Sequence, residues 1–391
     1  MIPYGKHFID DEDIQAVINT LKSNNLTQGP VVTEFENSLS KYVGSKYAVA
    51  VSSGTAALHL ANIAAGMTNG FFGITSPITF VSSANASLFC SGNVLFTDID
   101  KNYVNISLDK IHSLLNKYKN KIKTITPVHF AGLPLDLSSL KNLVKDEDVT
   151  IIEDASHALG ALYPDGSKVG SCKNSDMTVF SFHPVKAIAA GEGGAITTNN
   201  YDIYKNLLRL RSHGINKLDD EFVFRDQATE NGVVDPWYYE MQSLGYNYRI
   251  SDIQCALANS QLKKLDQFID RRKSIVKTYD EAFCNIKNIK LCQQIGRNLS
   301  AHHLYVIKID FKSLKKSRNQ VMMELRSKNI GTQVHYIPVY RHPFYKILGY
   351  AASDFPSSED FYETALSIPI YYSLSDEEQN YVIQSIMEVV K

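Results

Sequence analysis

The chain of 391 residues has little cysteine and no excess of charge of either sign. Its five cysteines are odd in number and form no CxxC pair, which favours a reducing compartment over a disulfide-stabilised secreted protein. Lys and Arg total 40 and Asp and Glu total 41, so the net charge is -1. That balance excludes attraction of the whole surface to nucleic acid or to an anionic membrane.

The sequence also lacks the segments that mark a membrane or secreted protein. No run of about 18 apolar residues is long enough to span a bilayer. The first residues, MIPYGKHFIDDEDI, are polar and acidic and do not form a basic start with an apolar core, so no signal peptide is expected. We therefore expect a cytoplasmic protein. His302 and His303 have no cysteine or carboxylate at ligand spacing, so no metal site is expected.

Apolar runs typical of strands alternate with helical stretches along the chain. An amphipathic helix is expected at about residues 12–23, and strands at 47–51, 71–76, 93–98, 122–128, 149–154 and 177–182. This alternation predicts an α/β fold with a mostly parallel sheet and helices on both faces. A long helical pattern begins at Ser251. We expect a large domain over residues 1–250 and a smaller α+β C-terminal domain over residues 251–391.

The chemistry is concentrated around one lysine. The stretch SDMTVFSFHPVKAIAAGEGGAITTN, residues 175–199, places Lys186 between a β-rich run and a glycine cluster. A lysine that forms a Schiff base with an aldehyde needs flexible backbone around it and a nearby anchor for the aldehyde's carrier. Lys186 is therefore the central candidate for a catalytic residue.

A phosphate site is predicted upstream of this lysine. The segment KYAVAVSSGTAALHLANIAAG reads as a strand over 47–51, a turn over 52–55 and then a helix. The free N–H groups and the positive dipole end of a helix N-terminus suit a phosphate, and Gly54 permits close approach of the backbone. Capping of this kind is common, so a purely structural turn is an equally good interpretation.

Two polar residues follow a buried strand in VTIIEDASHALGALY. Asp154 ends the expected strand, at the sheet edge where ligands bind in open α/β folds. Its carboxylate suits a pyridinium nitrogen, and His157 is close enough in sequence to contact the phenolic oxygen of the same ring. Taken singly, Asp154 is equally plausible as a helix N-cap and His157 as a surface histidine. Together with Lys186, they indicate pyridoxal 5'-phosphate (PLP).

The ordered motifs SSGTAALHL, SPITFVSSANA, EDASHALGA, SFHPVKAIAAGEGGAITT, RSHG and LGYNYRISDIQCALANSQL resemble the DegT/DnrJ/EryC1/StrS family of sugar-nucleotide aminotransferases. This resemblance covers nearly the whole chain and implies fold type I of the PLP enzymes, which is aspartate aminotransferase-like. The segments PWYYEMQSLGYNYRISDIQCALANSQLKKLDQFIDRR, HHLYVI, QVHYIPVY and FYETALSIPIY are similar to the members that act in pseudaminic acid biosynthesis. They imply transfer of an amino group from L-glutamate to C4 of UDP-2-acetamido-2,6-dideoxy-beta-L-arabino-hex-4-ulose, a UDP-linked 4-keto-6-deoxy-N-acetylhexosamine.

The resemblance also implies which residues hold the cofactor ring. Lys186 would form the Schiff base and move a proton as a general base, and Asp154 would pair with the pyridine nitrogen. Phe80 would stack on the ring, although a core phenylalanine is a serious alternative. His157 stands where the family more often has glutamine, which leaves its contact with the phenolic oxygen open.

The implied phosphate contacts come from two subunits. The amides of Gly54 and Thr55 and the hydroxyl of Ser181 would bind the phosphate. Asn247 of a neighbouring subunit would complete the site, so a homodimer with shared active sites is implied, and two-fold homodimers are also the commonest soluble oligomers. Arg249 could supply charge to the phosphate or to the substrate, and the sequence does not decide between them.

Substrate contacts are less specific in the sequence. Tyrosine and histidine suit a UDP-sugar, because they offer flat faces and hydrogen-bond donors. Each position taken alone is more often structural. The candidates by family position are Tyr4, Asn24, Leu26, Thr27, His303, Tyr305, His335 and Tyr336.

The loop between Gly214 and Leu244 contains the only tryptophan, Trp237, beside Tyr238 and Tyr239. Long irregular loops in compact enzymes often form lids or subunit contacts. A hydrophobic plug that holds the loop down is an equally good interpretation.

Several other functions are alternatives to this one. A related aminotransferase of the perosamine, bacillosamine or legionaminic acid type, acting at C3 or C4, fits the same motifs. A dehydratase of the family would have histidine in place of Lys186, and a non-catalytic regulatory member would lack one of Lys186, Asp154 and Ser181. A nicotinamide dehydrogenase would need GxGxxG after its first strand, and GEGG is not that pattern.

Overall fold

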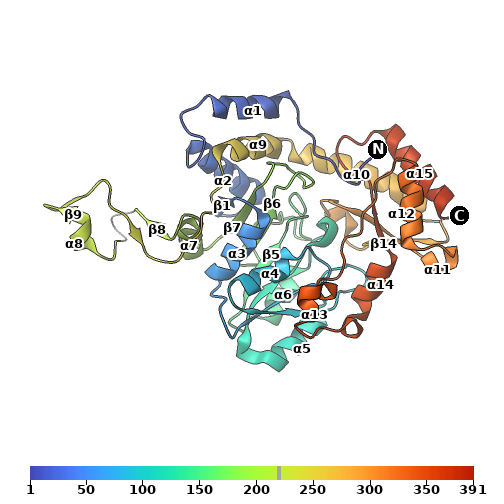
Figure 1. The fold of residues 1–391 in the computed structure, drawn as a ribbon, viewed down its shortest axis with the longest axis horizontal. Coiled ribbons are helices and arrows are strands. Elements are labelled where there is room, and N and C mark those ends of the chain that lie inside the picture. Colours follow the sequence, from blue (N-terminus) through green and yellow to red (C-terminus); the bar gives the residue numbers. More distant parts are fainter. Residues whose placement is uncertain (218–221) are drawn as a thin grey trace.

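The computed structural model describes residues 1–217 and 222–391 (Figure 1). Its large lobe is built on a seven-stranded sheet. In spatial order the strands are β1 (Tyr47–Val51), β7 (Gly194–Thr198), β6 (Met177–Ser181), β5 (Thr150–Asp154), β4 (Ile122–Thr126), β2 (Phe72–Thr75) and β3 (Asn93–Phe96). Only β7 runs against its neighbours β1 and β6. The predicted mostly parallel sheet is therefore confirmed, and the six expected strands lie within about two residues of their predicted bounds.

Strand β7 was not among the strands predicted from the sequence. It enters between β1 and β6, where a side chain at Gly194 would place its Cβ 2.5 Å from the carbonyl carbon of Ser53. The glycine therefore permits close packing beside the turn that precedes the phosphate-site helix. The prediction of a merely flexible glycine cluster was incomplete, because Gly193 and Gly194 are buried.

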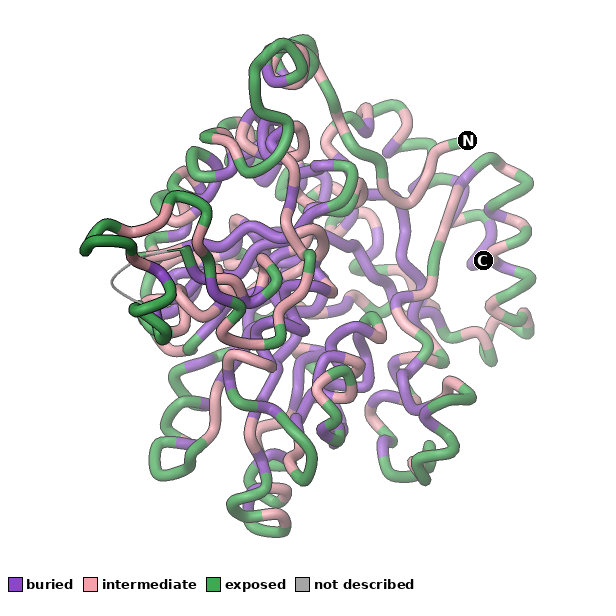
Figure 2. The backbone as a smooth tube through the Cα atoms, turned by 60° about the vertical axis from the view of Figure 1, so that its left-hand side comes forward, coloured by how far each residue is buried: buried purple, intermediate pink, exposed green. Residues whose placement is uncertain are grey.

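Helices cover both faces of the sheet, and the buried strands lie at the centre of the molecule (Figure 2). One face packs against α2 (Pro30–Val43), α5 (Leu108–Tyr118), α6 (Leu137–Leu143) and α9 (Asp252–Lys263). The other packs against α3 (Gly54–Ala64), α4 (Ser82–Phe89) and α7 (Tyr201–Arg211). An outer helix, α1 (Asp11–Leu21), lies against α9. Alternate residues of each strand therefore face different helix layers.

The small lobe has a three-stranded antiparallel sheet, β12 (Ile289–Leu291), β13 (Tyr305–Ile309) and β14 (Ala365–Ile368). Its helices are α10 (Leu265–Phe283), α11 (Phe311–Leu314), α12 (Arg318–Ser327), α13 (Pro343–Lys346), α14 (Pro356–Thr364) and α15 (Asp376–Val389). The long helix expected from Ser251 is divided into α9 and α10 at Lys264. The core of the large lobe reaches Ile269 and the next core begins at Ile275, both on α10. A domain boundary near residue 251 remains a proposal.

Short elements complete the chain. An arm projects from the body and carries β8 (Ile215–Asn216), α8 (Arg225–Ala228), β9 (Thr229–Glu230), β10 (Val233–Val234) and β11 (Glu240–Met241) (Figure 1). Trp237 in this arm is 73% exposed, so it is not a plug within its own chain. Single 3-10 turns occur at Lys119–Lys121, Phe130–Gly132, Arg297–Leu299, Val339–Arg341 and Ala352–Asp354.

The cysteines and the acidic and histidine side chains form no special centres in the described part of the chain. All five cysteines are free thiols, and burial raises the pKa of Cys172 to about 12. No group of three or more His, Cys, Asp or Glu side chains among the described residues is placed to hold a metal ion. Over the same residues, no helix has the length and apolar character needed to cross a bilayer.

One buried arginine connects α10 to two segments of the small lobe. The guanidinium of Arg272 donates to the carbonyl oxygens of His302, His303 and Ile370 at 3.2 to 3.3 Å. Burial lowers the pKa of Arg272 to about 10, so the group stays charged at neutral pH. It fixes the backbone on which His303 is carried.

We expect Arg272→Leu to lower the free energy of unfolding by about 3 kcal/mol or more, because three buried carbonyls each lose a charged donor. The neighbouring Lys273→Ala is the matched control. Lys273 forms an exposed pair with Asp270, so its loss should change stability by no more than about 0.5 kcal/mol. Urea denaturation of both variants measures the difference, and equal midpoints would contradict the role of Arg272.

Candidate active site

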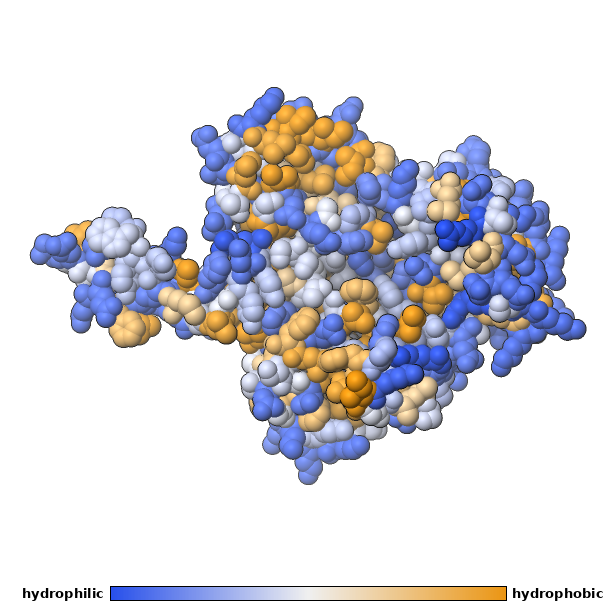
Figure 3. Space-filling view, in the orientation of Figure 1, coloured by the Kyte–Doolittle hydropathy of each residue, from blue (hydrophilic) through white to orange (hydrophobic). Residues whose placement is uncertain are grey.

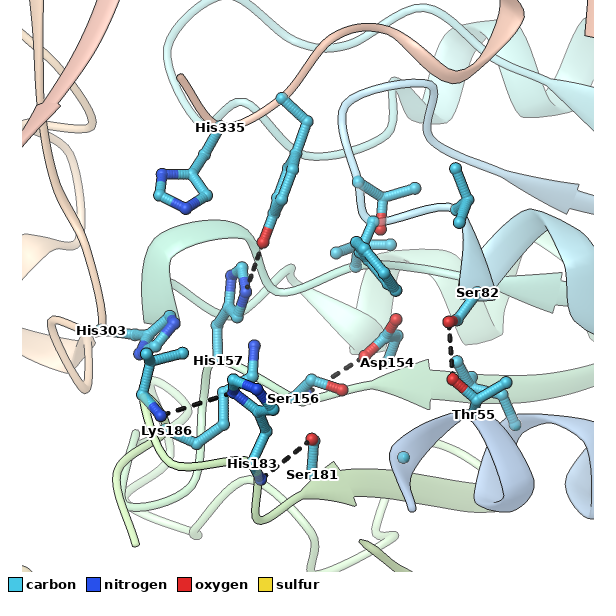
Figure 4. A pocket seen from close by; sticks show the side chains of 18 of the residues that line it. Thr55, Ser82, Asp154, Ser156, His157, Ser181, His183, Lys186, His303 and His335 are labelled. Atoms are coloured by element: carbon cyan, nitrogen blue, oxygen red, sulfur yellow. Dashed lines mark hydrogen bonds between the residues drawn. The ribbon is translucent and has the colours of Figure 1, made fainter. Parts of the chain in front are cut away.

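A cavity of about 790 Å³ opens at the carboxyl ends of β5 and β6 (Figure 4). The large lobe supplies the start of α3, the loop before α4, the ends of β5 and β6, and the segment that carries Lys186. The C-terminal part of the chain supplies His303, the segment 333–337 and His342, and Tyr4 enters from the N-terminal segment. The volume lies within the range of sites for cofactors and small molecules.

Strand alternation decides which side chains face the cavity. Ile152 and Val179 pack on the α3 side of the sheet, and two residues further along each strand come Asp154 and Ser181. Both therefore point to the side where α3 begins. Glu153 faces the opposite layer, where it is fully buried and bonded to His129 at 2.7 Å. Of these two adjacent carboxylates, Asp154 therefore lines the cavity and Glu153 does not.

The start of α3 forms a cup with Ser181. Ser53 caps the helix by accepting from the N–H of Ala56 at 3.1 Å, and the following residues, Gly54 and Thr55, line the cavity. The first N–H groups of an α-helix have no acceptor within the helix. A side chain at Gly54 would place its Cβ 2.9 Å from the Cβ of Ser181. Only glycine permits this approach of α3 to Ser181. The free N–H groups of the helix start and the Ser181 hydroxyl then line one cup, which suits a phosphate.

Asp154 is buried and held by two hydrogen bonds. The hydroxyl of Ser83 donates to one carboxylate oxygen at 2.6 Å, and the N–H of Ser156 donates to the other at 3.1 Å. No helix follows Asp154, so the interpretation of this residue as a helix N-cap was wrong. The carboxylate is oriented at the edge of the cavity.

Lys186 lies in the same cavity (Figure 4). Desolvation in the cavity lowers the pKa of Lys186 from its ordinary value of 10.5 to about 8, and the nearby charge of Asp154 partly offsets that effect. The fraction of neutral amine near pH 7 is then roughly 300-fold larger than for an exposed lysine. A neutral amine is the form that attacks an aldehyde or accepts a proton.

Three buried histidines form one wall of the cavity. Desolvation, followed by the charge of Lys186, holds the pKa of His157 well below its usual range and lowers that of His335 to about 3. Desolvation also holds the pKa of His303 well below its usual range. All three rings are therefore neutral at neutral pH and act as hydrogen-bonding groups. The interpretation of His157 as a surface histidine was wrong.

Phe80 lines the cavity and is 60% exposed. A core phenylalanine would be buried, so that alternative was wrong. Its ring lies 6.5 Å from the ring of Tyr336, measured between centroids. The exposed face can stack on a flat ligand.

Most of the predicted site residues converge on this cavity. They are Tyr4, Gly54, Thr55, Phe80, Asp154, His157, Ser181, Lys186, His303, His335 and Tyr336. The prediction for Tyr305 was wrong: its ring packs against Tyr279 and its hydroxyl donates to Asp280 at 2.7 Å, outside the cavity. This strand residue faces α10 and lines a separate space of about 10 Å³.

Five predicted or considered residues lie outside the cavity of their own chain. Asn24, Leu26 and Thr27 are exposed between α1 and α2. Asn247 is exposed and Arg249 is half-buried in the segment before α9. Their roles remain predictions, and that of Asn247 requires a second subunit.

Several residues of the site were not predicted from the sequence. Ser82 bonds to the Thr55 hydroxyl at 2.7 Å, and Ser83 and Ser156 hold Asp154. His183 and Glu192 also line the cavity. The sequence carries a usable signal for Ser82 and Ser83, because these serines directly follow Phe80 and Val81 in the motif SPITFVSSANA.

Comparison with known proteins agrees with this geometry. Residues 7–387 match the model of the DegT/DnrJ/EryC1/StrS aminotransferase family. The chain belongs to this family. The predicted enzyme class and fold type are confirmed by the match and by similar solved structures of sugar aminotransferases.

Two curated relatives are equally similar over the whole chain. The chain is 38% identical to the UDP-4-amino-4,6-dideoxy-N-acetyl-beta-L-altrosamine transaminase of Campylobacter jejuni, and the alignment covers 100% of this chain and 99% of that protein. It is also 38% identical to the spore coat polysaccharide biosynthesis protein SpsC of Bacillus subtilis, with 100% and 97% covered.

Among solved structures, Helicobacter pylori PseC, an aminotransferase involved in the biosynthesis of pseudoaminic acid, is 31% identical with a TM-score of 0.88. The match covers 100% of this chain and 99% of PseC. A putative sugar aminotransferase from Streptococcus pneumoniae, in its PMP-form, is 28% identical with the same TM-score, over 100% and 99% of the two chains. The fold is therefore shared along its entire length.

We expect the capture of PLP by cofactor-free protein to become faster as pH rises, with a midpoint near pH 8, because only the neutral amine of Lys186 reacts. Asp154→Asn should move this midpoint to lower pH, since Asp154 favours the protonated amine. The rate at which a visible absorbance band forms measures both. A wild-type midpoint near 10.5, the ordinary value for lysine, would contradict the enclosed position of Lys186.

Proposed function

We propose that the protein is a PLP-dependent nucleotide-sugar aminotransferase. In this proposal it transfers the amino group of L-glutamate to C4 of a UDP-linked 4-keto-6-deoxy-N-acetylhexosamine, as in pseudaminic acid biosynthesis. The observation that carries it is the convergence of Lys186, Asp154 and the cup of Gly54, Thr55 and Ser181 on one cavity.

The donor set of the cavity fits PLP. The close approach of the start of α3 to Ser181 requires a glycine at position 54, and the helix N–H groups there suit a phosphate. Asp154 offers a fixed carboxylate for a pyridinium nitrogen, and Phe80 offers an exposed aromatic face. When bound, PLP supplies an electron sink for the charge that develops on carbon.

The chain's own residues account for binding and proton movement. The Nζ atom of Lys186 takes a proton from the α-carbon of L-glutamate in one half-reaction and returns a proton to C4 of the sugar in the other. Asp154 places a carboxylate at the edge of the cavity. Together the half-reactions convert L-glutamate and a 4-keto sugar into 2-oxoglutarate and a 4-amino sugar.

The remaining cavity wall supports a sugar substrate. His303 and His335 are neutral and, with Tyr4, offer donors and acceptors without adding charge. Such groups suit sugar hydroxyls. The pseudaminic acid assignment is supported by the transaminase relative and by PseC. Because SpsC has the same 38% identity, another nucleotide-sugar aminotransferase is the second candidate.

We also propose a homodimer in the cytoplasm, with Asn247 reaching the phosphate site of the partner subunit. Apolar side chains gather on the surface over α1 (Figure 3), where Ile14 is 49% and Leu21 54% exposed. Leu26, in the segment after this helix, is 47% exposed. Such a patch is a usual feature of protein interfaces. Asn247 itself lies outside the cavity of its own chain, which leaves it free for a second subunit.

The substrate is tested by incubating PLP-loaded protein with L-glutamate and UDP-linked 4-keto sugars of both C5 configurations. We expect amination at C4 of the L-arabino ketone, with one equivalent of 2-oxoglutarate, as identified by NMR. Lys186→Ala should abolish turnover, whereas Lys173→Ala, which removes an exposed pair with Asp165, should not. Turnover of neither ketone, or full activity of Lys186→Ala, would refute the proposal.

The shared site is tested by mixing the inactive variant Lys186→Ala with the variant Asn247→Ala, at a PLP concentration too low to load Asn247→Ala alone. Asn247→Ala should weaken PLP retention about tenfold or more through loss of a hydrogen bond to a charged group. A hybrid dimer of Asn247→Ala and Lys186→Ala subunits has one complete site if Asn247 acts across the interface, so random mixing should restore about a quarter of wild-type activity. If Asn247 acts within its own subunit, no site is complete and no activity returns.

A further inference from the structure

The orientation of the His157 ring is fixed by the backbone. Its Nδ1 atom accepts the N–H of Ala131 at 3.3 Å, so the single proton of the neutral ring is on Nε2. That atom lies 3.1 Å from the hydroxyl oxygen of Tyr336. The N–H of Nε2 therefore donates to Tyr336, and a dashed line at His157 in Figure 4 marks this contact.

The loop that presents the Ala131 N–H is itself tightly held. The carbonyl oxygen of Ala131 accepts the N–H of His303 at 2.9 Å. A side chain at the next residue, Gly132, would place its Cβ 3.0 Å from the carbonyl oxygen of His157. The His303 ring packs on that of His157, with 4.3 Å between centroids. These contacts leave His157 little freedom to turn its only N–H elsewhere.

Tyr336 has one hydroxyl hydrogen left to donate. Among the described residues, the only hydrogen bond of its hydroxyl is the one with His157, and the side chain lines the cavity. Burial, together with the charge of Asp154, raises the pKa of Tyr336 above its ordinary value, so the hydroxyl stays protonated. The residue is thus a neutral donor whose oxygen is positioned by His157.

We propose that Tyr336 donates the hydrogen bond to the phenolic oxygen of bound PLP, and that His157 is a positioning residue for Tyr336 and not itself the contact. This inference rests on the proposed use of PLP. A glutamine, which the resemblance places at position 157, carries two N–H groups on its amide, whereas the neutral histidine has one. The single N–H of His157 already donates to Tyr336.

The test is the pH dependence of the visible band of the PLP-loaded protein. A donor to the phenolic oxygen favours the more anionic form of the chromophore and lowers the apparent pKa of the spectral change. Tyr336→Phe should raise that pKa by about one unit. His157→Leu should raise it less, and His157→Gln, which restores an amide donor, should rescue it.

The double variant separates positioning from direct contact. If His157 acts through Tyr336, the pair His157→Leu and Tyr336→Phe shifts the pKa no further than Tyr336→Phe alone. An unchanged pKa in Tyr336→Phe, or additive shifts in the double variant, would overturn the inference. Tyr305→Phe is the matched control, because it removes a hydroxyl outside the cavity and should leave the pKa unchanged.

Two measurements keep the result interpretable. Wild-type protein that shows no visible band with PLP would refute the proposed function and not this assignment alone. If a variant fails to fold, as judged by thermal unfolding without PLP, nitrogen NMR of the wild type reports the ring tautomer. A proton on Nε2 of His157 is expected, and a proton on Nδ1 would overturn the inference.

Discussion

Enclosure of the Lys186 amine beside a single carboxylate is the constraint on which the cavity depends. Burial penalises the charged amine and lowers its pKa to about 8, while Asp154 partly compensates. The amine is thereby reactive near neutral pH, but its charged form costs stability. Because the folded-state pKa is below the unfolded value, the cost is greatest below about pH 8 and falls as pH rises toward the ordinary lysine pKa. An enclosed lysine of this kind needs a functional reason.

The alternation of side chains along β5 and β6 places the other groups of the site around this lysine. Asp154 and Ser181 end neighbouring parallel strands and point to the face where α3 begins, so a carboxylate, a hydroxyl and a helix N-terminus surround the lysine. Gly54 and Gly194 allow the elements to approach at that edge. Segments of the small lobe close the other side with neutral histidines. Arg272 supports these segments by holding the carbonyl of His303.

The parts of the site that depend on local patterns could be predicted from the sequence. Strand ends and the small-residue turn indicated Asp154 and Gly54, because their positions follow from one segment each, whereas Ser181 was indicated only by the family resemblance. Tyr305 was misplaced, since the facing of a strand residue depends on which helix packs against it. Strand β7 was missed because its glycines suggested flexibility, whereas they serve close packing. Which residue His157 donates to is decided by the backbone N–H of Ala131, which occupies Nδ1 of the ring. No motif around His157 encodes that contact.

The most direct test of the central claim is chemical. PLP-loaded protein is reduced with borohydride, digested, and mapped by mass spectrometry. The account predicts a pyridoxyl adduct on the peptide that contains Lys186, and on no other lysine. An adduct confined to a different lysine, or no adduct after the visible band has been reduced, would contradict it.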